Sequence, residues 1–148
     1  MEEWNTLSLS FFSLSLSPHT KYFLLFLLEI ISGLEIETGI SKGLAREHGL
    51  CPICALGVED ELHFLVLCPM YQEERDKWWV AINTRISFVN HPADMSLVDE
   101  CRRSDREWLH LTLTAGVRLK SERSRKAVAR ATIQMVTMMW KKRHAWLT

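Results

Sequence analysis

The sequence lacks the patterns on which most enzymes depend. It has no glycine-rich phosphate-binding loop, and no serine stands in the Gly-x-Ser-x-Gly context of a nucleophile. Two-metal nucleotidyl transfer needs clustered acidic residues. The aspartates are instead scattered, with no adjacent pair, at Asp60, Asp76, Asp94, Asp99 and Asp105. We therefore expect a protein that is not an enzyme and has no small-molecule substrate.

The chain also lacks a long hydrophobic run. The longest, from Tyr22 to Leu34, has about 13 residues and contains Glu29, whereas a membrane-spanning helix needs about 20. The first residues are acidic, where a secretory signal is basic. Residues 6–17 alternate leucine, serine and phenylalanine. Three interpretations stay open. Residues 6–34 could contact a membrane, or residues from Lys21 to Ser32 could form a buried helix. In the third interpretation, the N-terminus is a non-coding tract that was translated by misannotation and joined to the rest of the chain near Gly33.

Net charge is absent too, but the two signs are separated along the chain. Eighteen basic side chains balance eighteen acidic ones, yet residues 1–100 carry 15 acids and 6 bases, a net charge of −9. Residues 118–148 hold one acid and nine bases. Such asymmetry suggests a nucleic-acid or membrane-surface contact. The candidate phosphate contacts are Arg118, Lys120, Arg123, Arg125, Lys126, Arg130, Lys141, Lys142 and Arg143.

Cysteine is scarce, and three of the four cysteines belong to one motif. Cys51, Cys54, His63 and Cys68 follow the pattern C-x2-C-x8-H-x4-C. Thiolates and imidazole are the ligands of tetrahedral Zn²⁺, and four protein ligands leave no position for a reacting water. The pattern therefore predicts a structural zinc site. A redox pair at Cys51 and Cys54, or a degraded site, are the alternatives, and Cys101 has no partner at useful spacing.

The spacing of the second ligand pair carries a structural condition. His63 and Cys68 would point about 140° apart on a straight α-helix. Pro69 pushes Cys68 out of helical backbone, so we expect a short helix from about Asp60 to Leu67 that ends at Cys68. The acidic residues 59–61 suit the start of that helix.

These residues resemble a known family. The run from Ile36 to Trp78 contains, in order, the cysteine pair, an acidic bridge, His-Phe-Leu, Cys-Pro and Tyr, and it is similar to the C-terminal zinc-binding segment of LINE-type (non-LTR) retrotransposon reverse transcriptases. The resemblance covers less than a third of the chain. It implies a zinc-stabilised fragment that helps a polymerase hold RNA or DNA, with the four motif residues as ligands. Without the polymerase core, such a fragment is non-catalytic or is a relic with no selected function.

Helical patterns dominate the rest of the sequence. We expect helices over 69–86, 96–101, 106–115 and 121–146, and a loop at 83–96. Arg75 is expected on the solvent side of the first of these helices. A strand at 109–113 is the alternative to the helix over 106–115. The predicted fold is mainly α, with four or five short helices around the zinc element and a poorly ordered or isolated N-terminal segment. The predicted regions are 1–33, 34–90 and 91–148. Reduced cysteines imply the nucleus or cytoplasm.

Overall fold

The structure, a computed structural model, describes residues 18–34, 39, 43, 48–114 and 116–148. Within these ranges the chain is mainly helical, as the sequence predicts, and the ranges contain no strand, only a β-bridge between Leu50 and Val58. Residues 109–113 are helical, so the strand alternative is wrong. The elements are α2 (Pro18–Ser32), a π-helix (His63–Leu67), a 3₁₀ turn (Pro69–Tyr71), α4 (Gln72–Val89), α5 (Pro92–Arg102), α6 (Asp105–Leu113) and α7 (Glu122–Leu147).

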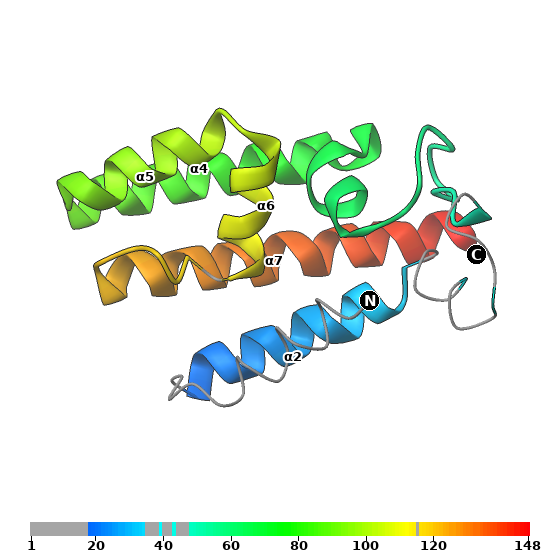
Figure 1. The fold of residues 1–148 in the computed structure, drawn as a ribbon, viewed down its shortest axis with the longest axis horizontal. Helices are drawn as coiled ribbons and strands as arrows, with labels where there is room; N and C mark the ends of the chain where they lie inside the picture. The colour runs from blue at the N-terminus through cyan, green and yellow to red at the C-terminus, as the bar shows by residue number, and fades with distance from the viewer. Residues whose placement is uncertain (1–17, 35–38, 40–42, 44–47, 115) are drawn as a thin grey trace.

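The long helix α7 forms the centre of the molecule (Figure 1). Helices α4 and α5 lie along one side of it, α2 lies along the other, and α6 crosses between α4, α5 and α7. The segment that carries the first two cysteines lies near the C-terminal end of α7. This arrangement brings the middle of the sequence against its end.

The boundary between α4 and α5 differs from the prediction of a loop over 83–96. Helix α4 continues to Val89 and ends at Asn90, which adopts a left-handed conformation with φ 55°. Helix α5 begins at Pro92, which is favourable in a first turn because it has no N–H to satisfy. His91 caps α5 by accepting a hydrogen bond from the backbone N–H of Asp94. The connection is therefore two residues long.

Helix α7 buries one stripe of side chains along nearly its whole length. Ser121 caps its start by accepting a hydrogen bond from the Ser124 N–H, as predicted. The buried stripe includes Val128, Met135 and Met139. Because these residues recur at helical spacing, a single face of α7 packs against α4 and the rest of the core.

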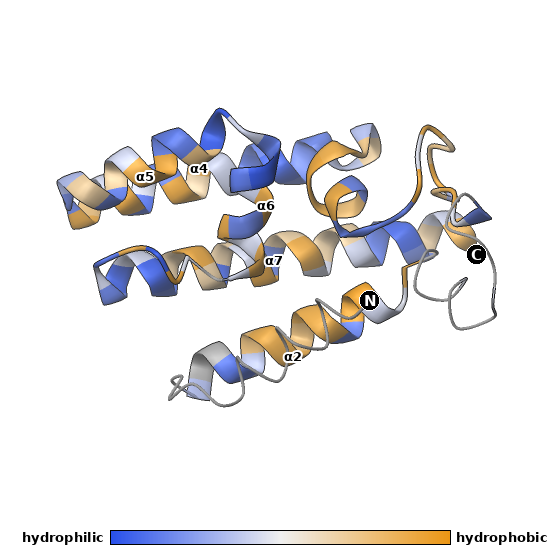
Figure 2. Cartoon of the chain, in the orientation of Figure 1, coloured by the Kyte–Doolittle hydropathy of each residue, from blue (hydrophilic) through white to orange (hydrophobic). Residues whose placement is uncertain are grey.

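Helix α2 is not isolated from this core. Phe23, Leu27 and Leu34 are buried in the same apolar cluster as α4 and α7, and α2 is the most continuously hydrophobic helix in Figure 2. A Cβ placed on Gly33 would lie 2.8 Å from the Trp140 ring, so this glycine allows the close approach of α2 to α7. Among the described helices, none is long and apolar enough to cross a membrane. Residues 6–17 of the candidate membrane segment lie outside the described residues.

Candidate metal centre

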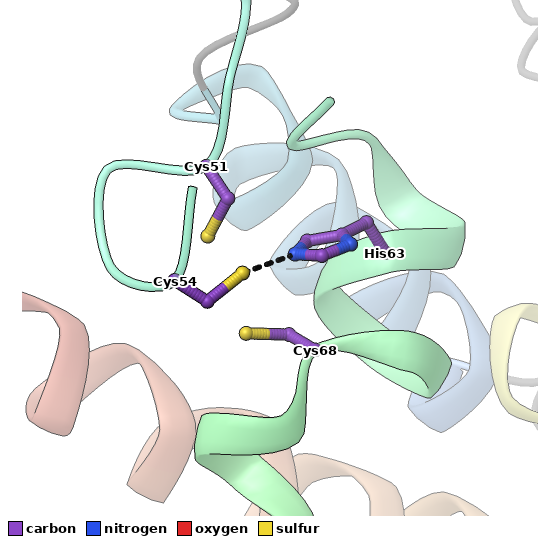
Figure 3. A group of neighbouring side chains, drawn as sticks. All are labelled: Cys51, Cys54, His63 and Cys68. Carbon is purple, nitrogen blue, oxygen red and sulfur yellow. Dashed lines mark hydrogen bonds between the residues drawn. The ribbon is translucent and has the colours of Figure 1, made fainter. Parts of the chain in front are cut away.

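The four motif residues converge on one point in the fold. One ligand atom from each of Cys51, Cys54, His63 and Cys68 lies within 4.8 Å of the other three (Figure 3). Cys54 Sγ and His63 Nε2 are 3.2 Å apart. Neighbouring sulfurs around tetrahedral Zn²⁺ lie roughly 3.8 Å apart, given Zn–S distances of about 2.3 Å. The observed spread is therefore close to the size of such a site.

A short hairpin presents the first two ligands. Cys51 donates a backbone hydrogen bond to the Gly57 carbonyl, and Glu59 donates one to Gly49. Between them the chain turns tightly, with the Ala55 N–H bonded to the Cys51 carbonyl. The Leu56 N–H donates to Cys54 Sγ at 3.4 Å. Backbone donors thus point at the cysteine sulfurs, as a thiolate site requires.

The second ligand pair is aligned by a π turn, which the sequence did not predict. The Cys68 N–H donates to the His63 carbonyl at 2.7 Å, five residues back. Such a bond places residue i+5 next to residue i, so the mismatch of about 140° on a straight α-helix disappears. Cys68 has extended backbone before Pro69, as predicted, and the Asp60 carboxylate accepts the His63 N–H at the start of the turn.

The orientation of His63 depends on Gly57 in the hairpin. A Cβ on Gly57 would lie 3.2 Å from His63 Nδ1, so the hairpin backbone packs directly against the ring. The other ring nitrogen, Nε2, faces Cys54. His63 itself is buried, so its ring is held within the fold beside the cysteines.

Hydrogen bonding between Cys51 and Cys68 separates the pKa values of the two thiols. It lowers the pKa of Cys51 to about 4 and raises the pKa of Cys68. A lowered pKa favours the thiolate form of Cys51, which is the form that binds a metal. Burial raises the pKa of Cys101, which lies outside the cluster and is a buried reduced thiol.

Two orphaned polar groups beside the cluster indicate what it holds. The buried Tyr71 hydroxyl has no hydrogen-bond partner in the described chain, nor do Nε and Nη1 of Arg75. Burial raises the pKa of Tyr71, and negative charge on Cys68 and Glu59 raises it further. Buried donors without partners cost free energy unless an anionic group lies close by. A metal–thiolate centre is such a group, so the donor set and its surroundings fit a bound divalent ion.

A buried ion pair joins the hairpin to the end of α7. Arg143 contacts the Glu59 carboxylate through Nε at 3.1 Å and through Nη2 at 2.6 Å, and both side chains are almost fully buried. Glu59 Oε2 also lies 3.6 Å from Cys51 Sγ. The sequence assigned Glu59 to a helix start and Arg143 to phosphate contact. The structure places both next to the metal ligands instead.

Arg75 is also placed differently from the sequence expectation of a solvent-facing residue. Only 1% of it is exposed, and its Nη2 donates to the Cys68 carbonyl and to Gln72 Oε1. Burial lowers the pKa of Arg75. Arg75 therefore adjoins the metal ligands from the α4 side.

The other candidate phosphate contacts divide into paired and open side chains. Three of them form ion pairs: Arg118 with Glu107, Lys126 with Glu122, and Lys142 with Glu73 and Glu74. A fourth, Arg125, donates hydrogen bonds to the backbone carbonyls of Leu119 and Lys120. Exposed side chains that form no ion pair with a described residue remain at Lys120, Arg123, Arg130 and Lys141. The structure therefore brings the four metal ligands together but leaves only part of the basic set on the surface.

Comparisons with protein-family models, with curated proteins and with solved structures find no match to this chain. The candidate site therefore has to be interpreted from its own geometry.

Proposed function

We propose that Cys51, Cys54, His63 and Cys68 hold one structural Zn²⁺ ion in a non-catalytic module. The convergence of the four donor atoms within 4.8 Å carries this proposal. The ion would cross-link the hairpin to the π turn, because each contributes two ligands. Four protein ligands complete a tetrahedral site, which is typical of structural rather than catalytic zinc.

Metal analysis of the full chain tests the zinc proposal. We expect about one Zn²⁺ per chain, and Co²⁺ substitution should give the visible absorption of a tetrahedral thiolate site. Cys54→Ser should lose this absorption, whereas Cys101→Ser, which changes a buried cysteine outside the cluster, should keep it. A wild-type chain without metal, or equal loss in both variants, would contradict the proposal.

We also propose that the solvent-facing side of α7 binds RNA or DNA. Arg123, Arg130 and Lys141 are exposed, and at 100° per residue they lie within about 20° of one another around the helix. They extend over about 27 Å at 1.5 Å per residue. Such a line of positive charge suits a sequence-independent contact with phosphates.

The salt dependence of binding tests this contact. Single-stranded RNA and duplex DNA should bind more weakly as salt rises, and changing Arg123, Arg130 and Lys141 to glutamine should flatten the slope by up to about 0.9 per contact. The matched control removes three exposed charges that lie outside α7, at Arg85, Arg103 and Arg106. Equal effects of the two triple variants would show that only net charge matters.

We further propose that the module derives from the tail of a LINE-type retrotransposon polymerase. The order of the motif residues supports this origin. Two motif residues that are not proposed ligands, Phe64 and Tyr71, take part in packing. Phe64 and Tyr71 are both buried, and their rings pack edge to face at 5.3 Å. Most of the resembling lead-in, residues 36–47, lies outside the described residues. A chain that binds neither metal nor nucleic acid would instead indicate a relic with no selected function.

A further inference from the structure

We infer that Arg75 is a positioning residue that supplies the buried counter-charge of the metal centre. The inference rests on the proposed zinc site and extends it to a residue outside the ligand set. Arg75 lies on the first turn of α4, 1% exposed, and its Nη2 donates to the backbone carbonyl of the ligand Cys68. It is therefore attached to the ligand backbone itself.

The buried charges around the proposed site balance when Zn²⁺ and Arg75 are both counted. Three thiolates and a neutral imidazole around Zn²⁺ carry a net charge of −1. Glu59 and Arg143 neutralise each other through their ion pair. Glu74, also buried, is paired with Lys142. Arg75 is the remaining buried charge in this part of the described chain, and its charge is opposite to that of the centre.

The hydrogen bonds of Arg75 support the same assignment. Its Nη2 is used by the Cys68 carbonyl and Gln72, but Nε and Nη1 have no hydrogen-bond partner among the described residues. An isolated buried cation is strongly unfavourable, and an anion beside it reduces that cost. A guanidinium in this position therefore favours an anionic metal–thiolate centre beside it.

Three substitutions at position 75 separate charge from hydrogen bonding and packing. Arg75→Met keeps an apolar stem and removes the charge. Arg75→Gln keeps a donor for the Cys68 carbonyl without the charge, and Arg75→Lys keeps the charge. We expect the methionine and glutamine variants to raise the Zn²⁺ dissociation constant roughly 10- to 100-fold, the range found for residues that support metal ligands. The lysine variant should recover most of the affinity.

The free energy of unfolding measured without metal distinguishes a positioning role of Arg75 from a purely structural one. With a chelator present, Arg75→Met should be as stable as the wild type or more stable, because it removes a buried unpaired charge. A residue needed only for packing would lower stability with and without metal alike. The matched control is Arg85→Met, which removes an exposed arginine from the same helix and should leave affinity unchanged.

Competition with a chromophoric chelator for Zn²⁺ and Co²⁺ gives the affinities, and chemical denaturation gives the stabilities. If Arg75→Met does not fold, the order of the lysine and glutamine variants decides the matter. Equal affinity of these two variants, or unchanged affinity in Arg75→Met, overturns the inference while leaving the zinc site intact. A wild-type chain that takes up no metal overturns both.

Discussion

The two ends of α7 are held by different kinds of interaction. Near its C-terminus, Arg143 is anchored by Glu59 on the hairpin of the candidate metal centre, and Trp146 stacks on Tyr71, three residues after Cys68. Farther toward its N-terminus, Val128 and Met135 lie in the apolar core, and Thr132 accepts a hydrogen bond from the Trp78 indole at 3.0 Å. One helix thus runs from the apolar core to a hairpin whose cysteines are positioned to bind a metal ion.

The tryptophan cluster and the hairpin differ in how much apolar surface they bury. Trp78, Trp79 and Trp108 pack with ring centroids 4.7 to 5.9 Å apart, and Arg102 lies over the Trp79 ring. In the hairpin, by contrast, Leu56 is 77% exposed. Apolar burial therefore stabilises the first region, whereas the hairpin depends on its ligands and on the Glu59–Arg143 pair.

Metal removal should produce the largest difference between the regions. Structural zinc contributes on the order of 10 kcal/mol in small zinc modules, so chelation should open the hairpin and free the end of α7. Hydrogen exchange should accelerate at the amides of Cys51, Ala55 and Glu59, which are bonded within the hairpin. The near-ultraviolet circular dichroism of the tryptophan cluster should persist. Uniform loss of protection along the chain would show that the two regions unfold together.

Trp78→Ala should act on the other region. Trp78 is 2% exposed, and truncating a buried tryptophan costs about 3 to 5 kcal/mol. Denaturation with and without metal should show the same loss, and Zn²⁺ affinity of the folded chain should stay unchanged. Val80→Ala is the control, because Val80 lies on the same helix and is 67% exposed. A change in Zn²⁺ affinity in Trp78→Ala would show that the tryptophans support the candidate ligands through the shared apolar core.

The metal ligands were predictable from the sequence because their chemistry and spacing are local. Pro69 also predicted the extended backbone at Cys68, but the π turn depends on a hydrogen bond that no residue type specifies. The partners Glu59 and Arg143 are 84 residues apart, so only the tertiary fold brings them together. A usable signal was nevertheless present, since Arg143 continues the helical spacing of the buried residues Val128, Met135 and Met139.

Basic residues were the least predictable because charge alone does not indicate exposure. Arg75 and Arg143 are buried because each has a specific acceptor, the Cys68 carbonyl and the Glu59 carboxylate. Arg123 and Arg130 are exposed on the same helix as Arg143. Buried and exposed arginines can be told apart only when it is known which face of each helix packs against the core. Composition does not contain that information.

Asp94→Asn tests how the start of α7 is fixed, with a smaller expected effect. The fully buried Asp94 carboxylate accepts the backbone N–H groups of Lys120 and Ser121 at 2.6 and 2.9 Å. Losing a buried, charge-assisted acceptor should cost about 1 to 3 kcal/mol. Urea denaturation should show the same loss with and without metal, because the contact lies far from the hairpin in sequence and joins α5 to α7.

The same contact predicts a pH dependence. Burial raises the pKa of Asp94, but hydrogen bonds from the Lys120 and Ser121 N–H groups hold it below its ordinary value. Since the folded pKa lies below the unfolded value of about 3.9, this contribution is complete above pH 4 and is lost as pH falls further. The difference in free energy of unfolding between the wild type and Asp94→Asn should therefore become smaller in acid. A difference that stays constant would contradict the assignment.

Ser121→Ala should give the smallest effect at this end of α7. The Ser121 side chain accepts the Ser124 N–H at 3.4 Å, and replacing such a cap by alanine costs about 1 kcal/mol. Ser87→Ala is the matched control, because Ser87 is an exposed residue inside α4, where alanine favours the helix. The loss should appear in the urea midpoint with no change in Zn²⁺ affinity. If affinity also fell, α7 would transmit changes at its start to the metal centre as one rigid element, and its two ends could no longer be treated as independent.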